Sequence, residues 1–212
     1  MSKIHQEFFD KDRLEVYNQL IHFQNIGYLA GGTALALQLN HRISVDFDIF
    51  VSSAISNQLR LKAERVFGNL KYYVESSDQI SFTTEKNINI TFVWYYFPLL
   101  LPKIPTSSIQ LASISDIAAD KAHTIGKRAV WRDYVDLFYI IKNDILTLTE
   151  IIKLAEKKFK GEFIATQFLE QLVYFNDLTI TKIDYIREKY TPAEIKSLLD
   201  QQTRLYLKKV LD

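Results

Sequence analysis

The sequence predicts an α+β fold in which a mixed half of helices and strands is followed by an all-helical half. Short apolar runs with a period of two alternate with helical segments up to about residue 112. Three prolines between residues 98 and 105 then interrupt regular structure. From Ser113 onward nearly every segment has helical period. We therefore expect two domains, residues 1–112 and residues 113–212.

In the first half the expected elements are short and closely spaced. Asp10 or Asp12 can cap a helix that runs to about Asn25, and Gly27 is placed to end it. Further along the half we expect a strand at 28–30, a helix at 34–40 capped by Thr33, a strand at 44–51, a helix from 53 or 56 to 67, strands at 70–76, 79–84 and 89–96, and a short edge strand at 109–112.

In the second half only helices are expected. They span about residues 115–127, 131–142, 149–159, 163–175 and 192–211. The chain is 48% hydrophobic and 13% aromatic, which is enough for a packed core. It has no cysteine, so disulfides and thiolate metal sites are excluded.

Charge and hydropathy exclude several classes of protein. The net charge is only +1, so polynucleotide binding by overall charge is not expected, and any such contact must be a local patch. The most apolar run, residues 92–101, has half the length needed to cross a bilayer. Residues 1–13 are polar and lack the apolar core of a signal peptide. We expect a cytoplasmic protein without a membrane partner.

The segment Gly31-Gly32-Thr33 has the composition of a phosphate-binding turn. Glycines at the start of a helix allow backbone N–H groups to approach a phosphate, and the helix dipole favours its negative charge. By itself the pattern also fits a tight strand-to-helix turn without a ligand.

Asp46 and Asp48 form the strongest candidate metal site. Alternation along the expected strand puts both carboxylates on one side, where they repel each other unless a cation neutralises them. Oxygen ligands of this kind suit Mg²⁺ or Mn²⁺. The alternative is the exposed face of an edge strand.

The two segments together match the signature of polymerase-β-type nucleotidyltransferases. In that signature a Gly-Gly or Gly-Ser turn precedes a helix, and Asp-x-Asp follows on the next strand. The sequence has Gly32-Thr33, twelve residues, and then Asp46-Phe47-Asp48. The resemblance implies a mixed-sheet nucleotidyltransferase domain followed by a helical domain that completes the active-site cleft.

The extended pattern Arg42-x-Ser44-x-Asp46-x-Asp48 resembles more specifically the AbiEii/AbiGii toxin family of bacterial nucleotidyltransferases. Those proteins are the toxin halves of type IV toxin–antitoxin and abortive-infection systems. The resemblance covers about residues 26–142, and the remaining helices contain no motif that matches it.

A second block, in the expected helices from Ser115 onward, is similar to the helical motifs of the same family. The family's active-site lysine and second aspartate correspond to Lys121 and Asp136. Lys121 can supply a point charge for a triphosphate, and Asp136 can orient Lys121 or bind a hydroxyl. The alternative is a surface ion-pair network that also includes Arg128, Arg132 and Asp133. For Arg132 and Asp133 we favour that alternative.

The resemblance implies a metal-dependent transfer of a nucleoside monophosphate from a nucleoside triphosphate to an acceptor hydroxyl. Asp46 and Asp48 would hold Mg²⁺, and the backbone of Gly31 to Thr33 with the Thr33 hydroxyl would hold the β and γ phosphates. Lys121 would stabilise charge on the leaving pyrophosphate. The implied acceptor is an RNA or tRNA 3′ end, or a protein hydroxyl, and the implied protein partner is a cognate antitoxin. Two alternatives stay open: a non-catalytic nucleotide- or RNA-binding module of the same fold, and an aminoglycoside-type nucleotidyltransferase.

Three further features bear on these expectations. Polymerase-β-type enzymes commonly have a third carboxylate on a later strand, and the residues at that place here are Asn89 or Thr91, so the general base is not identified. The aromatic residues of 92–97 are interpreted as core and interdomain packing in preference to base stacking. His123 is interpreted as a packing or surface residue, because the four histidines lack the spacing of a zinc site.

Overall fold

The computed structural model describes residues 3–211, which divide into two compact units. The first unit ends at Ser113 and the second begins at Ile114. Each unit has its own set of buried apolar side chains. Residues 1, 2 and 212, which the expected domains include, lie outside the described residues.

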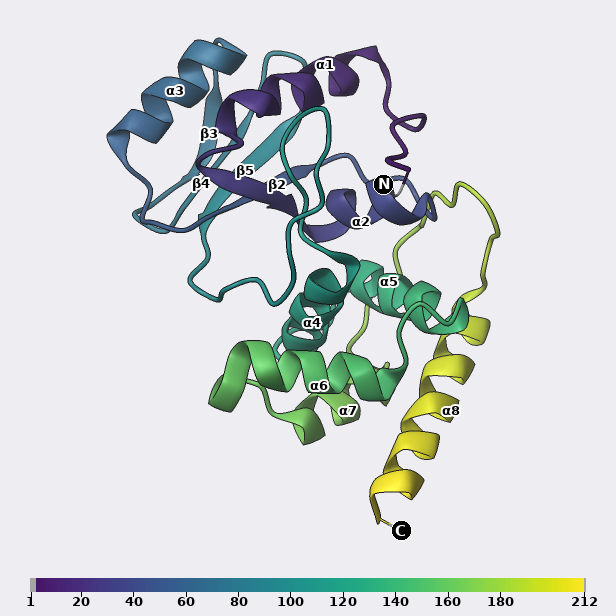
Figure 1. Ribbon diagram of the computed structural model, residues 1–212. Helices are drawn as coiled ribbons and strands as arrows, with labels where there is room; N and C mark the ends of the chain where they lie inside the picture. The colour runs from purple at the N-terminus through teal and green to yellow at the C-terminus, as the bar shows by residue number, and fades with distance from the viewer. Residues whose placement is uncertain (1–2, 212) are drawn as a thin grey trace. The chain divides into compact units, whose positions relative to one another are not determined.

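The first unit is built around a five-stranded mixed sheet (Figure 1). Its elements are α1 (Lys11–Gln19), the 3₁₀ helix η1 (Leu20–Phe23), β1 (Gly27–Ala30), α2 (Gly31–Leu39), β2 (Phe47–Val51), α3 (Asn57–Phe67), β3 (Lys71–Glu75), β4 (Gln79–Thr83) and β5 (Asn89–Trp94). The strand order is β1-β2-β5-β4-β3, and β2 and β5 form the parallel pair, while the other neighbours are antiparallel. β2 is therefore an inner strand with a neighbour on each side.

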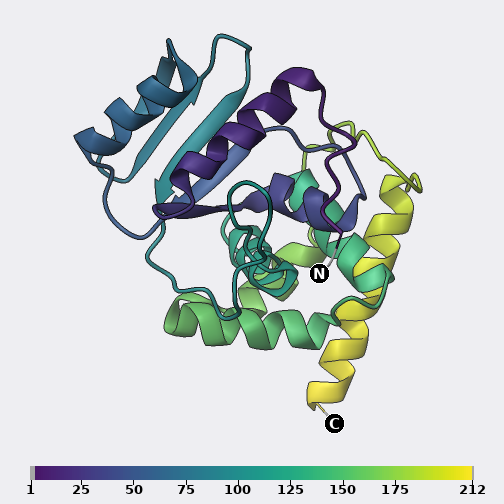
Figure 2. The same cartoon turned by 45° about the horizontal axis from the view of Figure 1, so that its top comes forward.

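Helices α1 and α3, with η1, cover one face of this sheet, as the ribbon seen in Figure 2 makes clear. Aromatic rings fill the space between the two layers. Phe23 of η1 stacks on Phe67 of α3 at 5.5 Å and lies 5.0 Å from Phe92 of β5. Tyr17 of α1 stacks on Phe47 of β2 at 6.4 Å. Because side chains alternate along a strand, the residues next to Phe47 and Phe92 point to the opposite face of the sheet.

Several element boundaries differ from the expected ones. Gly27 does not end a helix but begins β1, because the first helix stops well before it. Helix α2 begins at Gly31, three residues earlier than expected, and β2 begins only at Phe47. The segment at 109–112 is not a strand: Leu111 forms single bridges with Leu29 and with Ile104.

The second unit contains α4 (Ile114–Ile125), α5 (Trp131–Lys142), α6 (Leu148–Phe159), the 3₁₀ helix η2 (Lys160–Glu162), α7 (Ala165–Val173) and α8 (Pro192–Leu211) (Figure 1). Helix α4 packs against α5, α6 and α7, and α8 packs against α5, α6 and α7. A capping box of Thr147 and Glu150 begins α6, in which each side chain binds the other's backbone N–H. Across residues 3–211, the helices are all too short or too polar to span a bilayer.

Candidate active site

The turn from β1 into α2 has a backbone conformation that only glycine adopts readily. Gly31 has φ = +66°, in the left-handed region. A Cβ at this position would lie 2.8 Å from Oδ2 of Asp48, so the carboxylate lies directly against the first turn of α2. The first N–H groups of a helix have no intrahelical acceptor, and Ala30, which precedes the helix, provides no side-chain cap. This turn can therefore present N–H groups to an anion.

Gly32 and Thr33 face the segment that leads into β2. A Cβ on Gly32 would lie 2.7 Å from Nη2 of Arg42 and 3.0 Å from Oγ of Ser44. Thr33 is buried, and its hydroxyl donates to the main-chain carbonyl of Asp46 at 2.5 Å. The expectation that Thr33 caps the helix is wrong, because the helix begins two residues earlier. The Thr33 side chain instead links α2 by this hydrogen bond to the residue that precedes β2.

Asp46 and Asp48 lie on the sheet face opposite to α1 and α3. Asp48 is an inner-strand residue, with Ala30 of β1 and Thr91 of β5 as its register partners. Asp46 precedes the first residue of β2, and its Oδ1 accepts a hydrogen bond from Nδ2 of Asn89 at 3.2 Å. Asn89 and Thr91 are two residues apart on β5 and share a face, so the two carboxylates lie on the same side of the sheet. Both are partly exposed.

The place of a third carboxylate is taken by neutral side chains. Thr91 stands beside Asp48 in the parallel register, and its hydroxyl lies 3.0 Å from the Ser81 hydroxyl. Asn89 accepts a hydrogen bond from the Thr83 hydroxyl at 2.9 Å and donates to Asp46. Neither a hydroxyl nor an amide takes up a proton at neutral pH. Within residues 3–211 no group of three or more His, Asp or Glu side chains is arranged to hold a metal ion.

In the second unit, Lys121 and Asp136 form a direct ion pair between α4 and α5. The Lys121 ammonium lies 2.6 Å from Oδ2 of Asp136 and 2.7 Å from Oδ1 of Asp133. Asp136 is fully buried and Lys121 nearly so. The favoured interpretation, in which Arg132 and Asp133 belong to a surface ion-pair network, is wrong for Asp133, because its carboxylate binds the nearly buried Lys121 of the neighbouring helix. This group is not a surface network.

The structure contains a second buried lysine that the sequence analysis does not single out. Lys158 of α6 is completely buried and contacts Asp120 at 2.7 Å and Asp116 at 3.2 Å, both on α4. A signal for it exists in the sequence, since Lys158 falls between Ala155 and Phe159 in the apolar stripe of α6. A lysine at such a position needs a buried acid as a partner.

His123 and three exposed cations lie near the Lys121 group along the chain of the second unit. The imidazole of His123 stacks on Phe159 at 3.9 Å with nearly parallel planes, and burial, followed by the nearby Lys127, lowers its pKa. It is a packing residue, as expected. Arg128 and Arg132 are exposed, as is Lys127, and within the described part of the chain these three cations make no ion pair.

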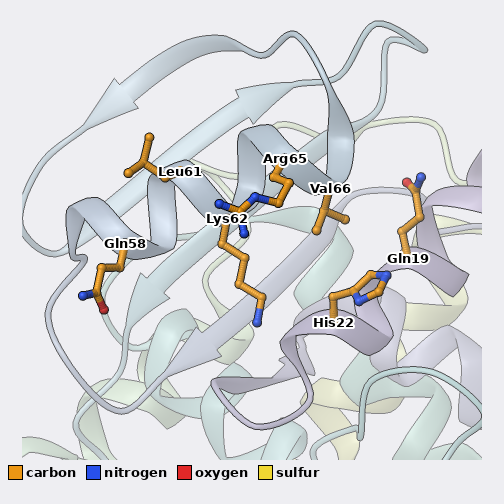
Figure 3. A pocket seen from close by; sticks show the side chains of 7 residues that line it. All are labelled: Gln19, His22, Gln58, Leu61, Lys62, Arg65 and Val66. Carbon is orange, nitrogen blue, oxygen red and sulfur yellow. The ribbon is translucent and has the colours of Figure 1, made fainter.

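A basic groove of the first unit, shown in Figure 3, lies apart from the candidate residues. It is about 680 Å³ in volume and runs between η1 and α3. The side chains that line it are Gln19, His22, Gln58, Leu61, Lys62, Arg65 and Val66. These helices cover the sheet face opposite to Asp48, so the groove does not belong to the candidate site.

Comparisons with known proteins bear on both halves of the chain. A family model described as nucleotidyl transferase AbiEii toxin of a type IV toxin–antitoxin system matches residues 57–209, a range that includes Lys121 and Asp136 and begins after Asp48. An uncharacterized protein from Aquifex aeolicus (strain VF5) is 35% identical over 159 residues, which are 71% of this chain and 74% of the relative.

Solved structures share the fold over nearly the whole chain. JHP933 from Helicobacter pylori is 16% identical with a TM-score of 0.58, covering 95% of this chain and 94% of that one. The nucleotidyltransferase toxin MenT4 from Mycobacterium tuberculosis is 17% identical with a TM-score of 0.59, covering 94% and 84%. The expected α+β nucleotidyltransferase fold is confirmed. The chain belongs to the AbiEii family of nucleotidyl transferase toxins of type IV toxin–antitoxin systems.

Proposed function

We propose that the protein transfers a nucleoside monophosphate from a nucleoside triphosphate to an acceptor hydroxyl, with Asp46 and Asp48 as metal ligands. One observation carries the proposal: the carboxylate of Asp48 lies against the Gly31 turn, 2.8 Å from the position of a Gly31 Cβ. An anion-binding helix start and a pair of carboxylates in contact with it suit a metal-bound triphosphate. A turn without a ligand would not require acids beside it.

The donor set fits Mg²⁺ or Mn²⁺. Asp46 and Asp48 offer hard oxygen ligands on one face of the sheet, and Mg²⁺ is commonly held by one or two carboxylates together with substrate phosphates. When bound, the ion would neutralise the negative charge on the reacting phosphate. Asn89 orients Asp46 through its amide, at 3.2 Å, and so limits the directions in which the other Asp46 oxygen can point.

The phosphate-binding role falls to main-chain groups. The N–H groups of Gly31, Gly32 and Thr33 are the first of helix α2 and point away from the body of the helix. The Thr33 hydroxyl is engaged with the Asp46 carbonyl, so the proposal assigns only the main-chain N–H of Thr33 to a phosphate. Because Gly32 has no side chain, Arg42 and Ser44 can lie close against this turn.

In the reaction the acceptor oxygen forms a bond to the α-phosphorus, the bond from that phosphorus to the β-phosphate oxygen breaks, and pyrophosphate leaves with the electron pair. The hydroxyl proton passes to solvent, because Asn89 and Thr91 cannot accept it. The proposed catalytic residues also include Lys121, which would stabilise the charge on the leaving pyrophosphate, and Asp136, which would orient Lys121. Their support is the buried ion pair at 2.6 Å, which holds the ammonium in one position.

The proposed acceptor is the 3′ end of an RNA such as tRNA. The exposed cations Lys127, Arg128 and Arg132, which lie close together along the chain, support contact with a phosphate backbone. The neutral residues beside Asp48 favour a second candidate function, namely a nucleotide-binding module without catalysis. For that candidate, calorimetry would detect triphosphate binding while no acceptor gains a label.

The experiment is a label-transfer assay with α-labelled nucleoside triphosphates, Mg²⁺ and total tRNA. The Asp46→Asn/Asp48→Asn variant keeps the size of both side chains and leaves an oxygen for the Asn89 amide. Asp78→Asn, on the exposed turn between β3 and β4, is the matched control. We expect wild type and control to transfer label and the double variant to lose it. Transfer that survives in the double variant would refute the assignment of these carboxylates.

A further inference from the structure

The first unit contains a cavity of about 540 Å³ whose walls include six aromatic side chains. It lies at the ends of β1, β2 and β5 and under the segment that follows β5. Its volume falls within the range of small-molecule sites. The rings that line it are Tyr28, Phe50, Trp94, Tyr95, Tyr96 and Phe97.

The walls of this cavity are fixed by ring-to-ring contacts. Phe50 lies 5.9 Å from Tyr28 and 4.3 Å from Tyr95, and Phe97 lies 5.5 Å from Tyr95 and 4.2 Å from Tyr96. Side chains that pack in this way lose little further freedom when a flat ligand binds between them. The cavity is therefore preorganised.

Core packing does not account for the outer part of this cluster. Trp94 is 39% exposed and Tyr96 is 64% exposed, whereas Phe92 of the same aromatic run is fully buried. Of the expected core and interdomain packing, the core role is confirmed for Phe92, whereas Trp94 and Tyr96 are exposed and are not core residues. Lys103 adds a cation to the rim, with its ammonium 5.9 Å from the centre of the Tyr28 ring. Exposed rings beside a cation resemble the surfaces on which nucleobases stack.

The cavity lies next to the candidate active site along strands β1 and β2. Tyr28 pairs with Phe50 in the β1–β2 register, and Ala30 pairs with Asp48 two residues further along the same face. Gly31 follows at once and touches Asp48. From Tyr28 to Gly31 the chain covers about 10 Å at the rise of a strand.

We propose that this aromatic cavity binds the base of the nucleotide. The order along β1 and β2 is aromatic cavity, carboxylate and helix start, and a nucleoside triphosphate has the matching order of base, reacting phosphate and terminal phosphates. The inference rests on the proposed function, because that function places the phosphates at Gly31 and the metal at Asp48. It adds the substrate's base and the residues that stack on it.

The test separates binding of the base from binding of the phosphates. Calorimetry in Mg²⁺ measures Kd for ATP, GTP, CTP and UTP, and for inorganic tripolyphosphate, on the full chain. Tyr96→Ala removes an exposed ring, Tyr96→Phe keeps it, and Tyr73→Ala removes an equally exposed tyrosine on β3, outside the cavity. We expect Tyr96→Ala to raise Kd about 5- to 100-fold for at least one nucleotide and to leave tripolyphosphate unchanged.

The remaining outcomes decide between the explanations. Tyr96→Phe should restore nucleotide binding, and Tyr73→Ala should match wild type. An unchanged Kd for every nucleotide in Tyr96→Ala, or an equal loss for tripolyphosphate, would overturn the proposal. Base-dependent binding without label transfer would contradict the proposed function alone. Label transfer at an unchanged KM in Tyr96→Ala would contradict the cavity assignment alone.

Discussion

Substitution of Gly31 by alanine should separate the stability of the first unit from the activity of its candidate site. At φ = +66° an alanine costs about 1–2 kcal/mol of folding free energy. The new Cβ would also lie 2.8 Å from Oδ2 of Asp48, whereas ordinary contacts begin at 3.4 Å. The carboxylate must move by about 0.6 Å, which a side-chain rotation allows at little energetic cost. A displacement of that size at reacting groups reduces rates by about 10- to 100-fold.

Gly68 offers a matched control. It has φ = +81°, so an alanine there is also strained, yet no atom lies within 4 Å of its Cβ. Urea denaturation should show that Gly68→Ala and Gly31→Ala lose similar amounts of stability, while the label-transfer assay finds wild-type activity only in Gly68→Ala. Equal activity in the two variants would show that the contact between the Gly31 turn and Asp48 has no part in the reaction.

Three further predictions concern the second unit. Lys158→Met leaves the buried carboxylate of Asp116 and the partly buried one of Asp120 without their cation and should lower the free energy of unfolding by about 3–5 kcal/mol in urea titration, whereas Lys157→Met, one residue away on the exposed side, should be nearly neutral. A double-mutant cycle on Lys121 and Asp133 should give a coupling energy above about 0.5 kcal/mol, and additive effects would contradict the ion pair between helices. Because burial lowers the pKa of His123 in the folded state, protonation of its imidazole favours unfolding. The free energy of unfolding should therefore fall as the pH drops below about 6.5 toward that lowered pKa. The variant His123→Phe should show a weaker dependence of this free energy on pH.

Periodicity along the chain predicted most of the fold. Helices α5, α6 and α8 and strands β3 and β4 lie within one or two residues of the expected spans. The buried faces of α5 and α6 repeat regularly, which is the signal that periodicity detects. The errors fall where tertiary contacts decide the backbone. Helix α2 begins at Gly31, a glycine at positive φ against which Asp48 lies, and the residues at 109–112 follow the edge of β1 without forming a strand. Neither contact has a local signature.

The sequence predicted which residues form the candidate site, but only some of the contacts that they make. Alternation correctly put Asp46 and Asp48 on one side, although only Asp48 lies within the strand. The sequence could not show that the Thr33 hydroxyl turns inward to the Asp46 carbonyl, since that depends on how α2 packs. Nor could it show that the ion pairs of Lys121 with Asp133 and Asp136 are buried between α4 and α5, since that depends on how the two helices pack.

The charges on α4 also determine which neighbour can lie on which side of that helix. Toward α6 it presents the carboxylates of Asp116 and Asp120, and toward α5, about 100° around the helix, it presents the Lys121 ammonium. Exchanging the two neighbours, or turning α4 by one residue, would bury like charges against each other. The positions of these buried charges therefore disfavour other arrangements of the helices in the second unit. They contribute more to the specificity of the fold than to its stability. A redesign that changes the charge of one residue in such a group therefore has to change the charge of its partner on the neighbouring helix as well.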